Sequence, residues 1–137
     1  TYTRNRIRNE LIPYIQKKFN PNIIETLDRL SELVLDEEDY MQNVTEEAFT
    51  EILIEQENTK IVLGLKEFNK LEYVIKTRII MQTTKILFGT SNGIEKKHVE
   101  DIIKLCGNNI GNKFLMPNKY YKISVKGGKV SFEKLSY

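Results

Sequence analysis

Apolar side chains recur every three or four residues along most of the first half of this chain. This period restricts the segment to amphipathic helices, because such spacing places apolar residues on one helical face. Asn20 and Pro21 interrupt the pattern with a helix cap and a first-turn proline, so a second, longer helix is expected to begin there. The pattern comprises Ile7, Leu11, Tyr14, Ile15, Ile23, Ile24, Leu27, Leu30, Val34, Tyr40, Met41, Val44, Ala48, Phe49 and Ile52.

The long helix is expected to be acidic. Residues 32–57 contain ten Asp and Glu side chains and no Lys or Arg. Thr45 could cap a second helical segment within this stretch. The run from Asp36 to Asp39 lacks the glycine turn and alternating ligands of a calcium loop, which favours a solvated helix face over a metal site. His98 is the only histidine and Cys106 the only cysteine, so no metal site is predicted.

The second half combines helices with β-strands. Residues 60–65 are short, β-branched and bounded by turn residues, which indicates a strand. An apolar helix is expected over residues 66–88 and ends at Gly89, and a further helix is expected over residues 94–106.

Alternating apolar residues on both sides of Gly127-Gly128 predict a tight hairpin, with Val125 opposite Val130 and Ile123 opposite Phe132. The predicted fold class is mainly α (α+β). We expect a helical bundle with a long acidic helix, a central apolar helix and a small C-terminal β-hairpin.

Charge is divided unevenly along the chain. Residues 1–60 carry seven Lys and Arg against thirteen Asp and Glu, a net charge of −6, whereas residues 61–137 carry fourteen against six, a net charge of +8. The basic half could bind a polyanion, or the two halves could pair with each other. The residue pattern leaves both readings open.

The first helix contains the string Arg4-Asn5-x-Ile7-Arg8-x-x-Leu11-x-Pro13. This string resembles the end of the catalytic domain in the tRNA(Ile)-lysidine synthetases. Weaker similarities to that family follow at residues 76–80, at residues 98–105 and at residues 115–117.

The resemblance implies that residues 1–19 are a linker helix from an ATP-pyrophosphatase domain outside this sequence, and that residues 20–137 are a tRNA-binding domain with a C-terminal hairpin. The parent enzyme would use ATP, Mg²⁺ and free lysine to modify the wobble cytidine of an isoleucine tRNA. It would be a C–N bond-forming ligase. The chain begins at Thr1 and contains no Ser-Gly-Gly-x-Asp-Ser loop. We therefore expect a fragment with no catalytic residue and no cofactor of its own.

Site residues also follow from the resemblance. Arg4, Asn5 and Arg8 would lie against the ATP domain, near its active-site edge. Tyr120 and Tyr121 could stack on a base, although a hairpin tyrosine more often has a packing role. Candidate contacts to the tRNA backbone are Arg78, Lys85, Lys96, Lys97, Lys104, Lys126 and Lys129.

Two other functions remain open from the sequence. The chain could be a structural or protein-interaction domain that pairs two copies into a homodimer without contacting RNA. A winged-helix DNA binder is disfavoured, because the helix over residues 94–106 offers lysines for phosphates but no set of base-reading side chains. One cysteine and no apolar run long enough for a membrane span predict a cytoplasmic protein with no membrane partner.

Overall fold

The computed structural model describes residues 2–108 and 111–136, and the chain divides into two units, Thr1–Gln42 and Asn43–Tyr137. The described part of the first unit is helical apart from a turn at residues 19–22. It contains α1 (Tyr2–Arg6), a π-helical turn η1 (Ile7–Leu11), α2 (Ile12–Lys18) and the first twenty residues of α3 (Ile23–Ile52). Every described residue from Tyr2 to Asn22 is exposed or half-buried.

The π-helical turn coincides with the centre of the arginine-containing string. The N–H of Ile12 donates to the carbonyl of Ile7, five residues earlier. Pro13 follows directly, has no N–H, and its ring crowds the carbonyl of Asn9 in an ordinary α-helix. The wider π-turn removes that clash, so the helical axis continues through the proline. The chain therefore accommodates Pro13 through a local change of helical type.

The long acidic helix is confirmed as α3, which runs without a break from Ile23 to Ile52. Asn20 caps the preceding turn, where its side-chain oxygen accepts the N–H of Asn22 at 2.9 Å. Thr45 does not cap a second segment. It is buried inside the helix together with Ala48, Phe49 and Ile52, because the last turns of α3 pack within the second unit.

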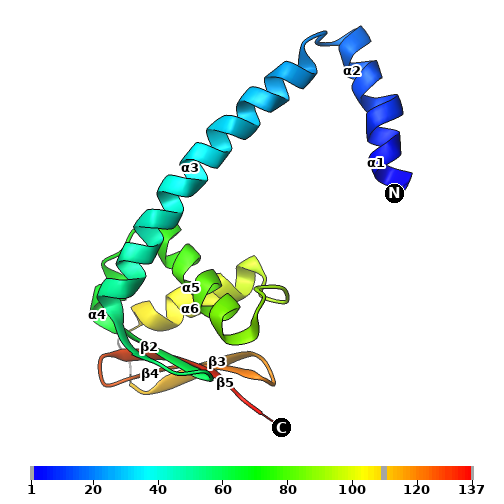
Figure 1. Cartoon of the computed structure of the whole chain (residues 1–137). Coiled ribbons are helices and arrows are strands. Elements are labelled where there is room, and N and C mark those ends of the chain that lie inside the picture. The colour runs from blue at the N-terminus through cyan, green and yellow to red at the C-terminus, as the bar shows by residue number, and fades with distance from the viewer. Residues whose placement is uncertain (1, 109–110, 137) are drawn as a thin grey trace. The chain divides into compact units, whose positions relative to one another are not determined.

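The second unit is built on a five-stranded antiparallel sheet in the order β1-β2-β5-β4-β3 (Figure 1). The predicted hairpin is confirmed, since Val125 pairs with Val130 and Ile123 pairs with Phe132. The hairpin belongs to a larger sheet than expected, because β2 pairs with β5, β3 pairs with β4, and β1 adds an edge strand beyond β2. The strands are β1 (Leu53–Gln56), β2 (Lys60–Gly64), β3 (Lys113–Asn118), β4 (Tyr121–Lys126) and β5 (Lys129–Lys134).

Helices cover one face of this sheet (Figure 1). The apolar helix expected over residues 66–88 is divided into α4 (Leu65–Asn69) and α5 (Tyr73–Phe88). The side-chain amide of Asn69 donates to the carbonyl of Cys106 at 2.9 Å, which ties the break to the end of α6 (Lys96–Gly107). Gly89 ends α5 in the left-handed conformation at φ 77°, as predicted.

The core lies between these helices and the inner face of the sheet. It contains side chains from α5, α6 and three central strands, so the mainly α (α+β) class is confirmed. Tyr121 is its largest fully buried side chain and shares a 2.9 Å hydrogen bond with Thr84. Burial raises the pKa of the Cys106 thiol to about 12, so this thiol is a packing group. None of the described helices is long and apolar enough to cross a membrane.

Candidate nucleic-acid interface

Lys126 and Lys129 lie at the tip of the hairpin, on either side of Gly127-Gly128. Both glycines have positive φ, at 58° and 76°, which gives the tight turn that brings the two strands together. The lysines are directly opposite each other in the ladder, and both are exposed. Within the described part of the chain, neither has an ion-pair partner. Like charges placed opposite each other repel, so this position favours a bound anion.

The two lysines belong to a larger surface on the sheet face away from the helices. Because side chains alternate across a strand, residues between the buried positions of β4 and β5 must point to this side. Phe114 of β3 pairs with Ser124, which pairs in turn with Ser131. We call this surface the outer sheet face; it comprises Phe114, Lys122, Ser124, Lys126, Lys129, Ser131 and Glu133.

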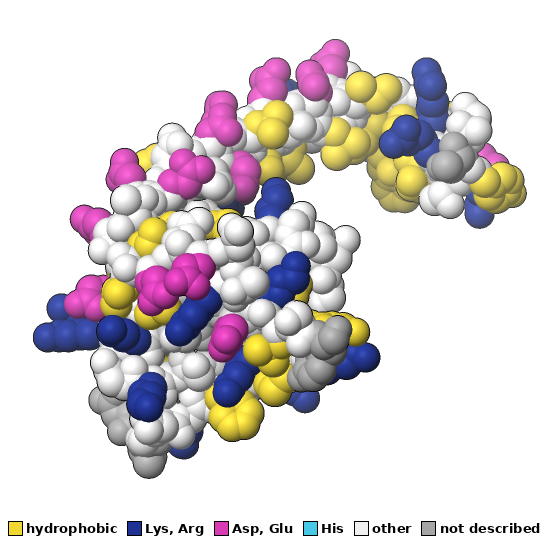
Figure 2. Space-filling model, turned by 60° about the horizontal axis from the view of Figure 1, so that its bottom comes forward, with side chains coloured by type: hydrophobic (Ala, Val, Ile, Leu, Met, Phe, Trp, Pro, Cys, Tyr) yellow, Lys and Arg dark blue, Asp and Glu magenta, His cyan; other side chains and the backbone are white. Residues whose placement is uncertain are grey.

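Sequence reasoning missed Lys122 of this face, and it also missed Phe114. Its side chain is 61% exposed, and the Lys122 ammonium lies 4.8 Å from the ring centroid. Figure 2 shows Lys and Arg side chains next to apolar ones on the lower part of the view. The available signal was the Lys-Phe-Leu run before Met116 and Pro117, although a proline is unfavourable within a central strand. It is accommodated because β3 is an edge strand with an irregular register before Asn118.

The α6 lysines lie near the opposite, helix-covered side of the sheet. Lys96 and Lys97 are exposed in the first turn, and Lys96 is 3.9 Å from Glu100. Lys97 lines a shallow pocket of about 440 Å³ together with His98, Asp101 and residues 115–117 of β3. Lys104 is in the last turn, where a positive charge also stabilises the helix dipole.

The two predicted phosphate contacts on α5, Arg78 and Lys85, differ in their exposure to solvent. Lys85 is exposed in the last turn of the helix. Arg78 is half-buried and already interacts with another group of the protein. Of the seven predicted phosphate contacts, the structure therefore pairs Lys126 with Lys129 and distributes the others over two helices.

The two tyrosines proposed for base stacking also differ. Tyr121 is 1% exposed and packs edge-on against Phe88 with ring centroids 4.8 Å apart, so the stacking prediction is wrong for it. The alternation that buries Ile123 and Val125 also turns Tyr121 inward. Tyr120 is exposed, with the Lys119 ammonium 4.9 Å from its ring.

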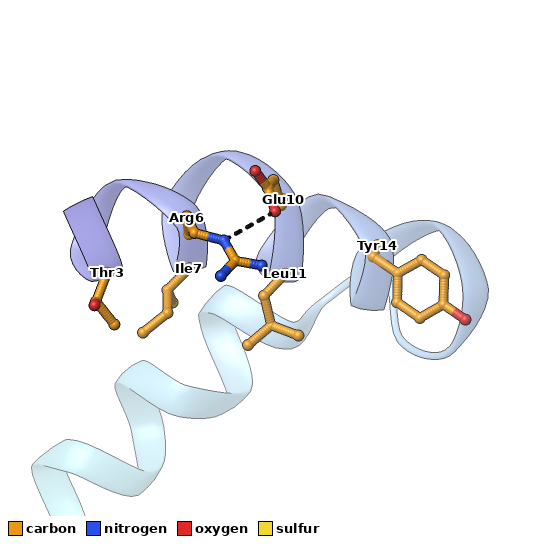
Figure 3. A pocket seen from close by; sticks show the side chains of 6 residues that line it. All are labelled: Thr3, Arg6, Ile7, Glu10, Leu11 and Tyr14. Carbon is orange, nitrogen blue, oxygen red and sulfur yellow. Dashed lines mark hydrogen bonds and ion pairs between the residues drawn. The ribbon is translucent and has the colours of Figure 1, made fainter.

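The N-terminal helix presents Arg4, Asn5 and Arg8 to solvent. Arg6 is paired with Glu10 one turn later, at 3.4 Å between Nε and Oε2. Thr3, Ile7 and Leu11 project from the same side of the helix, and with Arg6, Glu10 and Tyr14 they line a shallow groove of about 460 Å³ (Figure 3). The groove is lined by three apolar side chains, a threonine and the Arg6–Glu10 ion pair, and it is open to solvent.

The chain was compared with protein-family models and with known protein sequences. No protein-family model matches the chain. The chain is 35% identical over 114 residues, 83% of its length, to the tRNA(Ile)-lysidine synthase of Clostridioides difficile. It is 37% identical over 85% of its length to that of Clostridium acetobutylicum, and 31% identical over 98% to that of Clostridium tetani.

The predicted resemblance is confirmed: this chain is homologous to part of the tRNA(Ile)-lysidine synthases. It spans about a quarter of the length of these relatives, with 25%, 25% and 29% of the three proteins covered.

A lysidine synthase implies ATP and Mg²⁺, so the residues present can be tested against that requirement. No three His, Cys, Asp or Glu side chains of the described residues come together in a way that could hold a metal ion. The sequence contains no phosphate-binding loop. The residues that the structure describes therefore do not fit an ATP–magnesium site.

Proposed function

We propose that this chain is the tRNA-recognition portion of a tRNA(Ile)-lysidine synthase. The whole enzyme would adenylate the wobble cytidine of an isoleucine tRNA with ATP and release pyrophosphate. The ε-amine of free lysine would then displace AMP. This part of the protein would hold the tRNA while the rest of the enzyme, with ATP and Mg²⁺, carries out the chemistry in the cytoplasm.

One observation carries the proposal: a chain homologous to tRNA-modifying enzymes has an unneutralised pair of lysines on an otherwise basic unit. From residue 104 to the end, the sequence contains seven lysines and a single acid, Glu133. Phosphate contacts are electrostatic, and they position an RNA without reading its sequence. The acidic stretch over residues 32–57 would repel RNA and should face away from it.

The N-terminal helix has a different role in this proposal. We assign residues 1–19 to a linker and residues 20–137 to the tRNA-binding domain, with Arg4, Asn5 and Arg8 against the ATP-binding domain. Their exposure supports this assignment, because an arginine that contacts a neighbouring domain has to be available on the surface. The exposed apolar groove beside them would be covered by the same contact.

The test is to neutralise Lys126 and Lys129 together, as Lys→Gln, in the full-length protein. We expect tRNA affinity to fall by about 1 kcal/mol per contact, as for a charge-assisted bond that is partly exposed. Filter binding at low and moderate salt measures this loss. The fold should be unchanged, because both side chains are exposed at a turn.

Two controls accompany this measurement. Lys17 and Lys18, changed in the same way, remove an equal charge from the other unit and should leave affinity unchanged. Neutralising Asp36 and Asp39 should not reduce it either. If the acidic variant loses affinity while the hairpin variant keeps it, the assignment of the binding face is wrong.

A row of exposed apolar side chains along α3 in the first unit favours a second candidate function, homodimerisation. Ile23, Leu27, Leu30 and Val34 follow the a and d spacing of a coiled coil, and the last three are about half exposed or more. Figure 2 shows acidic side chains along one side of α3 and apolar ones along the other. Sedimentation measures the mass of the wild-type chain and of the Leu27→Glu variant. If the chain is a homodimer, the wild type sediments as a dimer and the variant as a monomer; if it is not, both sediment as monomers.

A further inference from the structure

We infer that the outer sheet face binds a single-stranded segment of RNA, with one base stacked on Phe114 and the flanking phosphates on Lys122, Lys126 and Lys129. This inference rests on the proposed function and makes it more specific. It names the surface, the form of RNA and the residue that holds a base.

Phe114 has the environment of a stacking platform. Its partners across the sheet, Ser124 and Ser131, are small and leave the ring uncovered, so its side chain is 61% exposed. The aromatic side chains of the core, such as Phe68 and Phe132, are fully buried. An exposed phenyl ring beside lysines offers a flat apolar face on which an unpaired nucleic-acid base can stack.

The lysines surround this ring in register with the strands. Lys122 and Lys126 lie two residues to either side of Ser124 on β4, which is a step of about 6.8 Å along an antiparallel strand. Lys129 lies opposite Lys126. Three ammonium groups therefore lie on β4 and β5 beside one exposed ring. A single RNA strand, in which phosphates and bases alternate, could place phosphates on the lysines and a base on the ring.

Charge complementarity favours an anionic occupant, and the exposed ring among the lysines favours RNA over an acidic protein. Glu133 pairs with Lys122 across the ladder and is the one carboxylate among the residues that define the outer sheet face. The ammonium of Lys122 lies 4.8 Å from the centroid of the Phe114 ring, and Phe114 remains 61% exposed beside it. Ser124 and Ser131 add hydroxyl groups that can bond to ribose or phosphate oxygens.

The platform requires an unpaired base. In an RNA duplex the bases are stacked on one another and their faces are inaccessible, whereas loops and ends can place a base on an aromatic side chain. Stacking of this kind tolerates any base, because each has a π-face. The outer sheet face should therefore prefer single-stranded over double-stranded RNA.

The experiment uses the 137-residue chain and two probes of equal length, a single-stranded RNA containing 2-aminopurine and the same sequence as a duplex. Phe114→Ala should weaken single-strand binding by about tenfold, which lies within the range for losing one base–aromatic contact. Phe114→Tyr should keep the affinity, because a phenol ring stacks equally well. The wild-type chain should quench 2-aminopurine fluorescence, and Phe114→Ala should not.

The matched control is Ile54→Ala, which removes an exposed apolar side chain from β1 at the other edge of the sheet. It should bind both probes as the wild type does. If the wild-type chain binds the RNAs and Phe114→Ala binds the single strand equally well, the inference is overturned while the proposed function stands, and the exposed ring is then a protein contact. If the wild-type chain binds neither RNA nor tRNA at low salt, both are overturned.

Discussion

Thr83 and Thr84 are neighbours on α5 and both are buried. Among the described residues, the Thr84 hydroxyl is hydrogen-bonded and the Thr83 hydroxyl is not. The Thr84 hydroxyl donates to the carbonyl of Ile80 at 2.8 Å, so its lone pair accepts the hydrogen bond from Tyr121. Among the described residues, the Thr83 hydroxyl has no partner. A buried polar atom without a partner costs free energy, whereas a satisfied one contributes to stability.

We predict opposite effects when each threonine is replaced by valine, which has the same shape and a similar helix propensity. Thr84→Val should lower the free energy of unfolding by about 1–3 kcal/mol, because it leaves the Tyr121 hydroxyl buried and unpaired. Thr83→Val should be neutral or raise it by about 1 kcal/mol. Denaturant unfolding measures both, and equal losses would contradict this account of α5.

At the scale of single elements, α6 begins with an unusual cap. The N–H of Glu95 donates to His98 Nδ1 at 3.0 Å, and the Glu95 side chain accepts the N–H of His98 in return. Each side chain thus satisfies a backbone donor that the first helical turn leaves unpaired. The single histidine of the chain has a structural role at this position.

We predict that His98→Ala lowers the free energy of unfolding by about 1 kcal/mol, the usual cost of losing a cap. His98→Gln should retain most of the stability, since a glutamine at this position can also reach the first N–H of the helix. Urea unfolding of the two variants distinguishes them. A glutamine variant as unstable as the alanine variant would show that His98 contributes through packing instead.

Local signals explain which elements could be predicted from the sequence. The Gly-Gly turn fixed the register of β4 and β5, and Gly89 marked the end of α5. β1 and β3 were missed because their pairing depends on distant partners, and a proline such as Pro117 is unfavourable within a central strand. The break between α4 and α5 depends on the long-range bond from Asn69 to Cys106, which has no sequence signature.

The candidate site was predictable only in part, for the same reason. Lys126 and Lys129 could be placed together because a hairpin brings its own flanks into contact. Phe114 could not be assigned to their surface without the pairing of β3 with β4. Stacking was the wrong role for Tyr121, because its alternation with Ile123 and Val125 already places it on their buried face.

At the scale of the whole molecule, positive and negative charge are concentrated in different parts of the chain. Residues 61–137 have a net charge of +8 and residues 1–60 a net charge of −6. A polyanion should therefore contact the second unit and avoid the acidic face of α3. Binding should also weaken steeply as salt rises, because each phosphate contact releases counterions.

Lysine footprinting tests this central claim most directly. The chain is acetylated briefly with and without an isoleucine tRNA at low salt, and the reactivity of each lysine is measured by mass spectrometry. The account predicts that tRNA protects Lys122, Lys126 and Lys129, while Lys17 and Lys18 of the first unit remain as reactive as in the free protein. Protection of Lys17 and Lys18 with full reactivity at the hairpin, or no protection at any lysine, would contradict it.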